Sequence, residues 1–230
     1  MVESKITMIT RARSGVGDKM AELKDQLKEA LVELRKGKER KFDQSVDLIV
    51  NLQKFEVRKH NINLFVNVPN RIKDKNIAGF LESKNKNIDS ITKEEFKKYV
   101  KDKKLVKNLV NKYDFFIAQG SLMPLVASTF GRVLGPAGKM PSPQMGIILN
   151  ADDKTIAELK EKINKGVKVK VKEPSVKLAI GKQSMKDEEI IENALTVYNA
   201  LLKEMPRDKE NIKNIELKFT MTKPVKIGVR

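Results

Sequence analysis

Residues 120–146 read GSLMPLVASTFGRVLGPAGKMPSPQMG and form the most distinctive stretch of the chain. Glycines and prolines recur around two basic side chains, Arg132 and Lys139. Glycine permits a positive φ and proline fixes φ, so this pattern predicts a short helix over 123–130 and then a specified loop over 131–146. Neither nucleotide motif fits: Val133 stands where a Walker motif needs glycine, and the glycines miss the dinucleotide spacing.

Strands and helices alternate on both sides of this loop. An apolar run over 114–119 predicts a strand that is buried on both faces. Capping boxes that begin at Thr92 and Thr155 predict two helices, the first of which carries Phe96 and Val110. This alternation predicts an inserted three-layer α/β domain, Rossmann-like, over 69–159.

The two ends of the chain follow a different pattern. Apolar residues recur every three or four positions over 19–36 and 187–203, which predicts two amphipathic helices. Alternating apolar residues predict half-buried strands at 45–52, 63–68, 167–172, 215–222 and 225–229. Residues 1–68 and 160–230 are therefore expected to form one discontinuous α+β domain, an antiparallel or mixed sheet with two helices.

The charge balance favours a polyanionic partner. The chain holds 47 Lys and Arg against 30 Asp and Glu, a formal net charge of +17. Such an excess raises the expectation of nucleic-acid binding. The alternative is a lysine-rich surface that serves solubility or thermal stability.

Several functional classes are disfavoured by composition. The chain has no cysteine and one histidine, His60, so thiolate chemistry, disulfides and histidine-based metal clusters are not expected. No nucleophile and base can be paired, and neither an enzyme nor a cofactor is expected. The first residues lack the apolar core of a secretory signal, and no run is long enough for a membrane span, so a soluble protein of a reducing compartment is expected.

Candidate anion-binding residues lie in the terminal segments. Lys168, Lys170 and Lys172 repeat about every 7 Å on one strand face, where they would meet either phosphates or only solvent. Phe42 follows Lys41 and lies outside the strand pattern, so its ring would either stack on a base or cap the core.

Hydroxyl side chains supply further candidates. Ser184 precedes Asp187 by three residues, which predicts a helix N-cap that is compatible with phosphate binding. Thr220 and Thr222 offer hydroxyls to phosphate or 2′-OH groups, or serve only as surface strand residues. Met221 alternates with the core residues and is expected to be buried.

Four segments resemble a known family. They are TFGRVLGPAGKMPSP, VKVKEPSVKLAIGKQSM, the Lys41-Phe42 pair and FTMTKPVKI, and together they resemble the L-one family of universal large-subunit ribosomal proteins, in its archaeal style. The resemblance implies two domains, with both termini in one domain, which binds large-subunit ribosomal RNA at the mobile stalk. It also implies help in releasing deacylated tRNA from the exit site, repression of the chain's own operon mRNA, a cytoplasmic location and a monomer when free.

The resemblance also assigns roles to residues of this chain. The RNA-contacting positions that it implies are Lys41, Phe42, Ser45, Ser184, Thr220 and Met221, with Lys168, Lys170 and Lys182 as adjoining cations. Thr222 is included as a contact candidate, although many members have glycine there to let RNA approach the backbone. Lys177 replaces a histidine of the bacterial pattern. Arg132 and Lys139 are expected to make secondary contacts with RNA or tRNA.

Two other functions compete with this one. A nucleotide-dependent α/β enzyme would use the loop over 131–146 to hold phosphate, although the spacings fail. A nonspecific RNA-binding protein would need only the charge.

Overall fold

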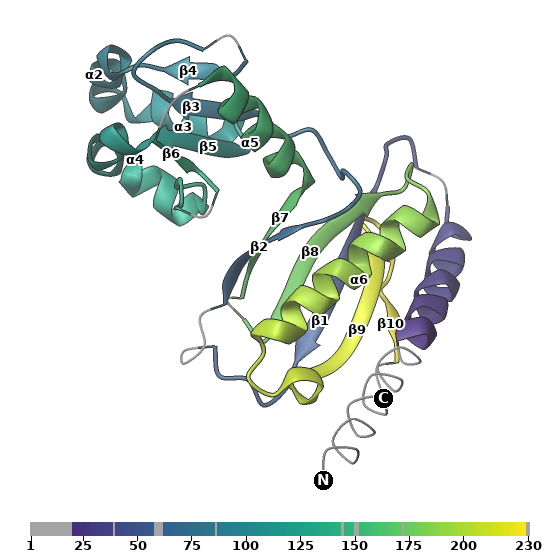
Figure 1. Cartoon of the computed structure of the whole chain (residues 1–230). Helices are drawn as coiled ribbons and strands as arrows, with labels where there is room; N and C mark the ends of the chain where they lie inside the picture. The colour runs from purple at the N-terminus through teal and green to yellow at the C-terminus, as the bar shows by residue number, and fades with distance from the viewer. Residues whose placement is uncertain are drawn as a thin grey trace. The chain divides into compact units, whose positions relative to one another are not determined.

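The computed structural model of the chain describes residues 20–38, 40–57, 62–85, 87–143, 145–149, 152–171 and 173–228 (Figure 1). The chain divides into two compact units. Unit 1 comprises Met1–Ile72 and Val167–Arg230, and unit 2 comprises Lys73–Gly166. The sequence placed the boundaries at 68/69 and 159/160, and the second of these would cut a helix that packs entirely on unit 2.

An antiparallel sheet is the centre of unit 1. Its strand order is β10-β9-β1-β8, with β1 (Ser45–Leu52), β8 (Ser175–Lys182), β9 (Ile212–Phe219) and β10 (Val225–Ile227). Alternate residues of β1, such as Val46 and Leu48, are buried, whereas the residues between them stay partly exposed. One core joins these residues to α6 (Asp187–Glu204) and to a helix over 20–35. Figure 1 shows α6 lying along one face of this sheet. One face of the sheet therefore carries the core and the other remains accessible.

A second, two-stranded sheet completes unit 1. It pairs β2 (Asn63–Asn67) with β7 (Gly166–Lys170) and joins the same core through Val66 and Val169. Both strands had been predicted. Lys172 and His60 lie outside the described residues.

Unit 2 is built on a parallel sheet of order β4-β3-β5-β6, with β3 (Ile77–Phe80), β4 (Asp89–Ile91), β5 (Phe115–Gln119) and β6 (Ile147–Ile148). Successive residues of β5 enter opposite cores, because Phe116 and Ala118 pack in one cluster and Ile117 in the other. The first cluster includes residues of α2 (Lys93–Lys101), α3 (Lys103–Lys112) and α4 (Met123–Ala137), and the second includes α5 (Asp153–Lys165). Unit 2 therefore has three layers, helices, sheet and helix.

The predicted glycine- and proline-rich loop is shorter than expected. The helix α4 does not end at Phe130 but continues through Gly131, Gly135 and Pro136 to Ala137. It continues because Val126, Phe130 and Leu134, spaced four residues apart, all bury against the sheet. Pro136 loses the hydrogen bond to residue i−4 and crowds that carbonyl, so the burial of these three side chains has to offset its cost. The helix ends at Gly138, whose φ of 69° suits glycine.

Two helix predictions are also corrected. The single helix expected after Thr92 is broken at Asp102, which adopts an extended conformation and accepts a hydrogen bond from the Lys104 N–H. The helix that was predicted from the capping box at Thr155, α5, begins earlier, at Asp153. Among the described helices, none is long and apolar enough to cross a membrane.

Candidate nucleic-acid interface

Three chain segments meet where the strands β1, β8 and β9 of the unit 1 sheet begin or end. The first is residues 41–45, before and at the start of β1, the second is residues 182–185, at and after the end of β8, and the third is residues 220–222, after β9. We call these segments together the three-turn face. Antiparallel pairing brings them together, because Ser45 lies opposite Lys182 and Val46 opposite Phe219. The central strand thus gathers residues separated by more than 130 positions in the sequence.

Ser45 and Thr220 fix one another. The Ser45 N–H donates to Thr220 Oγ1 at 3.1 Å, and the Thr220 N–H donates to the Ser45 carbonyl at 3.1 Å. Their backbones and the threonine hydroxyl therefore hold a set position before any ligand arrives. Thr220 is exposed and Ser45 is half-buried.

Gln44, in the first segment, makes hydrogen bonds to the other two segments of the three-turn face. Its side chain is buried, with 2% exposure, and its Oε1 accepts a hydrogen bond from the Met221 N–H at 3.1 Å. Its Nε2 donates to Gln183 Oε1 at 3.2 Å, and its carbonyl accepts from the Gln183 N–H at 2.8 Å. A buried amide with these partners anchors the turns that surround it.

Two large apolar side chains project from this anchored edge. Phe42 is 52% exposed and Met221 is 59% exposed. The alternative that Phe42 caps the core is therefore wrong, and so is the expectation that Met221 is buried. The alternation stops because β9 ends at Phe219, whose N–H donates to the hydroxyl of Thr222 at 2.9 Å and closes a turn.

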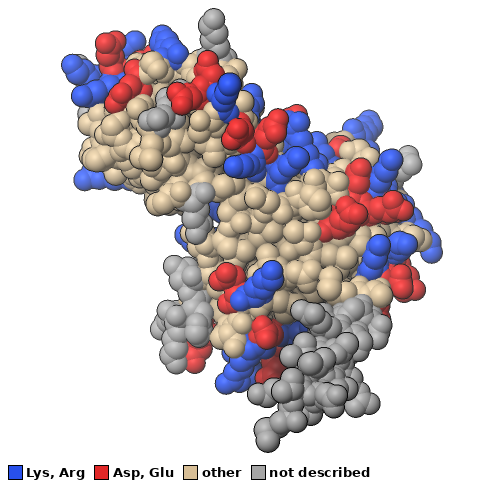
Figure 2. Space-filling model, viewed as in Figure 1, with Lys and Arg blue, Asp and Glu red and all other residues tan. Residues whose placement is uncertain are grey.

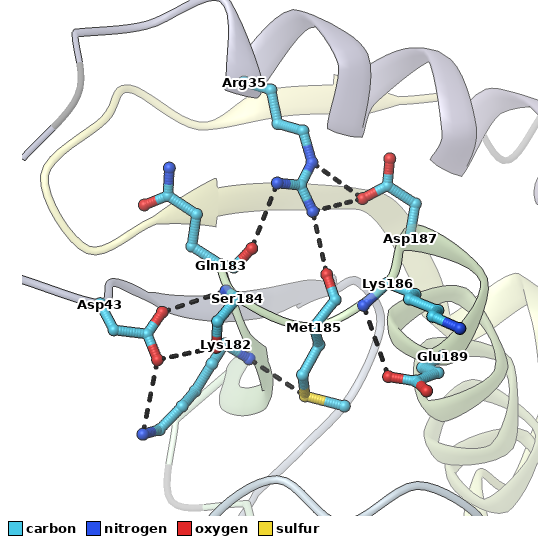
Figure 3. A network of polar contacts seen from close by, with 9 residues as sticks. All are labelled: Arg35, Asp43, Lys182, Gln183, Ser184, Met185, Lys186, Asp187 and Glu189. Carbon is cyan, nitrogen blue, oxygen red and sulfur yellow. Dashed lines mark hydrogen bonds and ion pairs between the residues drawn. The ribbon is translucent and has the colours of Figure 1, made fainter.

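Asp43 holds the turn after β8 (Figure 3). Its carboxylate accepts from the N–H of Ser184 at 3.1 Å and from the Ser184 hydroxyl at 2.9 Å, and it pairs with Lys182 Nζ at 3.5 Å. Desolvation raises the pKa of Asp43, but the bonds from Ser184 and the charge of Lys182 outweigh it and leave the pKa below its usual value. The N-cap prediction for Ser184 is wrong, because α6 is capped at Lys186 and this serine binds Asp43 instead.

Arg35, at the end of the helix over 20–35, braces the same turn from its other side (Figure 3). Its guanidinium donates to the carbonyls of Gln183 at 3.2 Å and Met185 at 3.0 Å. It also makes two bonds to Asp187 Oδ1, at 2.9 Å and 2.6 Å. The planar donor group thereby fixes the backbone between β8 and α6.

The two strand lysines lie elsewhere in unit 1. Lys168 and Lys170 are both exposed on β7, which belongs to the other sheet. Burial lowers the pKa of Lys168, and the neighbouring charge of Lys170 lowers it further. They form a separate basic site on the same unit.

The two basic residues of the glycine- and proline-rich stretch are in unit 2. Arg132 is exposed on α4. Lys139 is half-buried, and its ammonium donates to the carbonyls of Val110 at 2.7 Å and Tyr113 at 2.8 Å. Lys139 thus satisfies the carboxyl end of α3. A Cβ atom at Gly146 would lie only 3.1 Å from the Phe116 carbonyl, so this position favours glycine. The contacts described for this glycine- and proline-rich stretch are therefore with other residues of unit 2.

The sequence reasoning missed the residues that hold the three-turn face in place. Arg35, Asp43, Gln44 and Gln183 bind across about 140 to 150 positions of sequence, and no local spacing indicates such pairs. The only available signal was the polar sequence after Phe42, which interrupts the apolar alternation before β1.

The arrangement suits a flexible polyanion with stackable rings. An exposed aromatic ring lies in the same face as ordered hydroxyls and the cations Lys41 and Lys182. Hydroxyl, backbone N–H and ammonium groups bind phosphate and sugar, whereas aromatic rings stack on bases. Among the described residues, no group of three acidic or histidine side chains could hold a metal ion.

Comparisons with known proteins agree with this chemistry. A sequence model of the Ribosomal protein L1p/L10e family matches residues 34–223. A large ribosomal subunit protein uL1 of Nanoarchaeum equitans is 37% identical over 214 residues, which cover 88% of this chain and 98% of the relative. The uL1 proteins of Thermofilum pendens and Thermococcus kodakarensis are 37% and 33% identical over 219 residues each, 90% of this chain and 92% and 99% of the relatives. The relatives are ribosomal proteins rather than enzymes, and the chain belongs to the Ribosomal protein L1p/L10e family.

Proposed function

We propose that this protein is a structural component of the large ribosomal subunit that binds ribosomal RNA of the stalk through the three-turn face. Membership of the family supports the ribosomal role. The observation that carries the proposed site is the pair Phe42 and Met221, both more than half exposed on an edge that buried Gln44 anchors. Exposing two large apolar side chains has no benefit for the isolated fold, whereas each can pack on a base or ribose.

The division of labour between the units is part of this proposal. Unit 1 is the RNA-binding domain, formed by both ends of the chain, and unit 2 is an inserted domain that adds secondary contacts. Lys168 and Lys170 extend the basic surface of unit 1, and Arg132 is the freer of the two secondary candidates because Lys139 is occupied by carbonyls.

Two finer activities follow from the same face. Stalk movement would help deacylated tRNA to leave the exit site, and an mRNA that presents the same structure would be bound and repressed. A translation assay with the chain's own operon leader tests the second activity. Adding the protein should reduce synthesis from that leader, and excess stalk RNA should restore it.

The Phe42→Ala variant tests the site itself. Loss of stacking should weaken binding to a stalk ribosomal RNA fragment by about 1–3 kcal/mol, roughly fivefold to 150-fold. The melting temperature should not change, because the ring is already exposed. Filter binding or fluorescence anisotropy at fixed salt measures the effect.

Leu149→Ala is the matched control, since Leu149 is an exposed apolar residue of unit 2 with 86% exposure. It should bind as the original chain does. Unrelated RNA of equal length, added as competitor, separates specific from nonspecific binding. The proposal fails if Phe42→Ala and Leu149→Ala have equal affinity, or if unrelated RNA competes equally.

A further inference from the structure

The positive charge of unit 2 is concentrated on two neighbouring helices. Residues 93–112, which form α2 and α3, hold eight lysines and three acidic residues. The side chains of Lys93, Lys97, Lys98, Lys104 and Lys107 are exposed, and among the described residues no ion pair neutralises any of these ammonium groups. Figure 2 shows basic side chains, with acidic ones between them, at the edge of unit 2 where Figure 1 places α2.

The opposite layer of the same unit is balanced. The helix α5 carries four lysines and three acidic residues, with Asp153 in its first turn and Lys162 and Lys165 in its last. These positions suit the helix dipole, and Glu158 precedes Lys162 by one turn in the favourable order. The lysine excess is therefore specific to one layer of unit 2.

Apart from its N-cap, Asp102, and Lys112 in its last turn, the helix α3 is charged against its own dipole. It begins with two lysines, has no acidic residue in its first turn and contains none at all along its length. Cations near a helix N-terminus oppose the dipole, and like charges such as Lys104 and Lys107, three residues apart, repel. A helix that served only solubility would interleave acidic residues, as α5 does. Departures from local rules of this kind occur at functional surfaces.

A membrane surface does not fit these helices. An interfacial helix needs an exposed apolar face. The apolar residues Phe96, Val106 and Val110 are buried in the core of unit 2. Among the described large apolar side chains of α3, Leu105 is the exposed one. The surface offers charge and little else, and charge alone binds a phosphate backbone without reading its sequence.

We propose that the α2–α3 lysine surface of unit 2 is a second RNA-binding surface, which contacts the phosphate backbone of RNA independently of its sequence. This inference rests on the proposed function, because the RNA that it meets is the one brought by the three-turn face. The surface raises affinity for any RNA by a common factor and leaves discrimination to unit 1.

The test compares two triple variants of the full chain. K97Q/K104Q/K107Q removes three charges from the α2–α3 surface, and K154Q/K162Q/K165Q removes three exposed charges from α5. Each is titrated with the stalk fragment and with unrelated duplex RNA at several salt concentrations. Each lost phosphate contact lowers the steepness of the log affinity against log salt by about 0.7–0.9, so the α2–α3 triple should lose about 2–3 and the α5 triple close to none.

The outcomes separate the two proposals. We expect the α2–α3 triple to weaken binding to both RNAs by the same factor, with the ratio of their affinities unchanged. Equal salt slopes for the two triples would overturn the inference while leaving the proposed function intact. If the original chain does not prefer the stalk fragment, the proposed function itself fails. Loss of binding to anionic vesicles without any change in RNA binding would assign the surface to membranes and also overturn the inference.

Discussion

The three-turn face of unit 1 and the α2–α3 surface of unit 2 are both basic, but they are built in opposite ways. On the three-turn face, nearly every polar group is held by another part of unit 1, through Asp43, Gln44 and Arg35. On α2 and α3 the described lysine side chains are exposed, and the ion pair described for them is that of Lys112 with Asp89. Fixed groups can distinguish one RNA shape from another, whereas unfixed charges only attract phosphate.

Positive charge is therefore a poor guide to where ordered polar groups lie in this chain. The most basic helices carry no sign of an ordered site, and the ordered site places a carboxylate, Asp43, among its lysines. That carboxylate reduces the local charge and in return fixes a turn.

The largest effect is expected for Gln44→Met, which keeps the size of the side chain but removes its hydrogen bonds. The Met221 N–H and the side-chain oxygen of Gln183 then lose their buried hydrogen-bond partner. This loss should lower the free energy of unfolding by about 1–3 kcal/mol. Specific RNA affinity should fall as well, because both neighbouring turns are released. Chemical denaturation and anisotropy measure the two effects.

Val50→Ala controls for lost stability, since Val50 is fully buried on the same strand, β1, away from the three-turn face. It should destabilise unit 1 to a similar extent while the folded protein keeps its RNA affinity. Equal RNA affinities for the two variants would show that the Gln44 network serves the fold alone.

An intermediate effect is expected for Lys139→Met in unit 2. Two carbonyls at the end of α3 lose a charged donor, which should cost about 2 kcal/mol of local stability. Hydrogen exchange of the α3 and β5 amides should accelerate, with affinity for the stalk fragment unchanged. Arg132→Met, at an exposed position, should alter exchange little. Unchanged exchange with weakened RNA binding would instead make Lys139 an RNA contact.

The smallest effect is a pH dependence at Asp43. The pKa of this carboxyl is lowered in the folded protein, so its contribution to stability is present above its ordinary value near 3.8 and is lost as pH falls below it. The stability difference between the original chain and Asp43→Asn should therefore shrink between pH 6 and pH 3. Asp25→Asn, at an exposed site on the helix over 20–35, provides the comparison in thermal melts. A difference that stays constant over this range would contradict the assigned role.

Periodicity predicted most of the elements because burial is what spaces apolar residues. The alternation of Val46 with Asp47 and the repeat of Leu23, Leu27 and Leu31 are consequences of one covered face. Composition misled only where packing overrode it. Gly131 and Pro136 suggested a loop, but Phe130 and Leu134 extend the helix through both.

The candidate site was less accessible to sequence reasoning. Residue patterns singled out Phe42 and Thr220 as candidates and the resemblance added Ser45, and all three lie together on the three-turn face. Periodicity misplaced Met221, since a strand pattern does not show where the strand ends. The supporting residues were absent from the prediction because hydrogen bonds between residues such as Gln44 and Gln183 leave no periodic trace.

The pairing of β1 has a consequence for the order of events during synthesis. Its two neighbours in the sheet, β8 and β9, begin at Ser175 and Ile212, so β1 waits for partners that the ribosome makes more than 100 residues later. Unit 2, with its short-range parallel strands and helices, is complete by Gly166 and can fold first. The three-turn face closes only when Thr220 has emerged, so a nascent chain lacks this face until all three of its segments have been made.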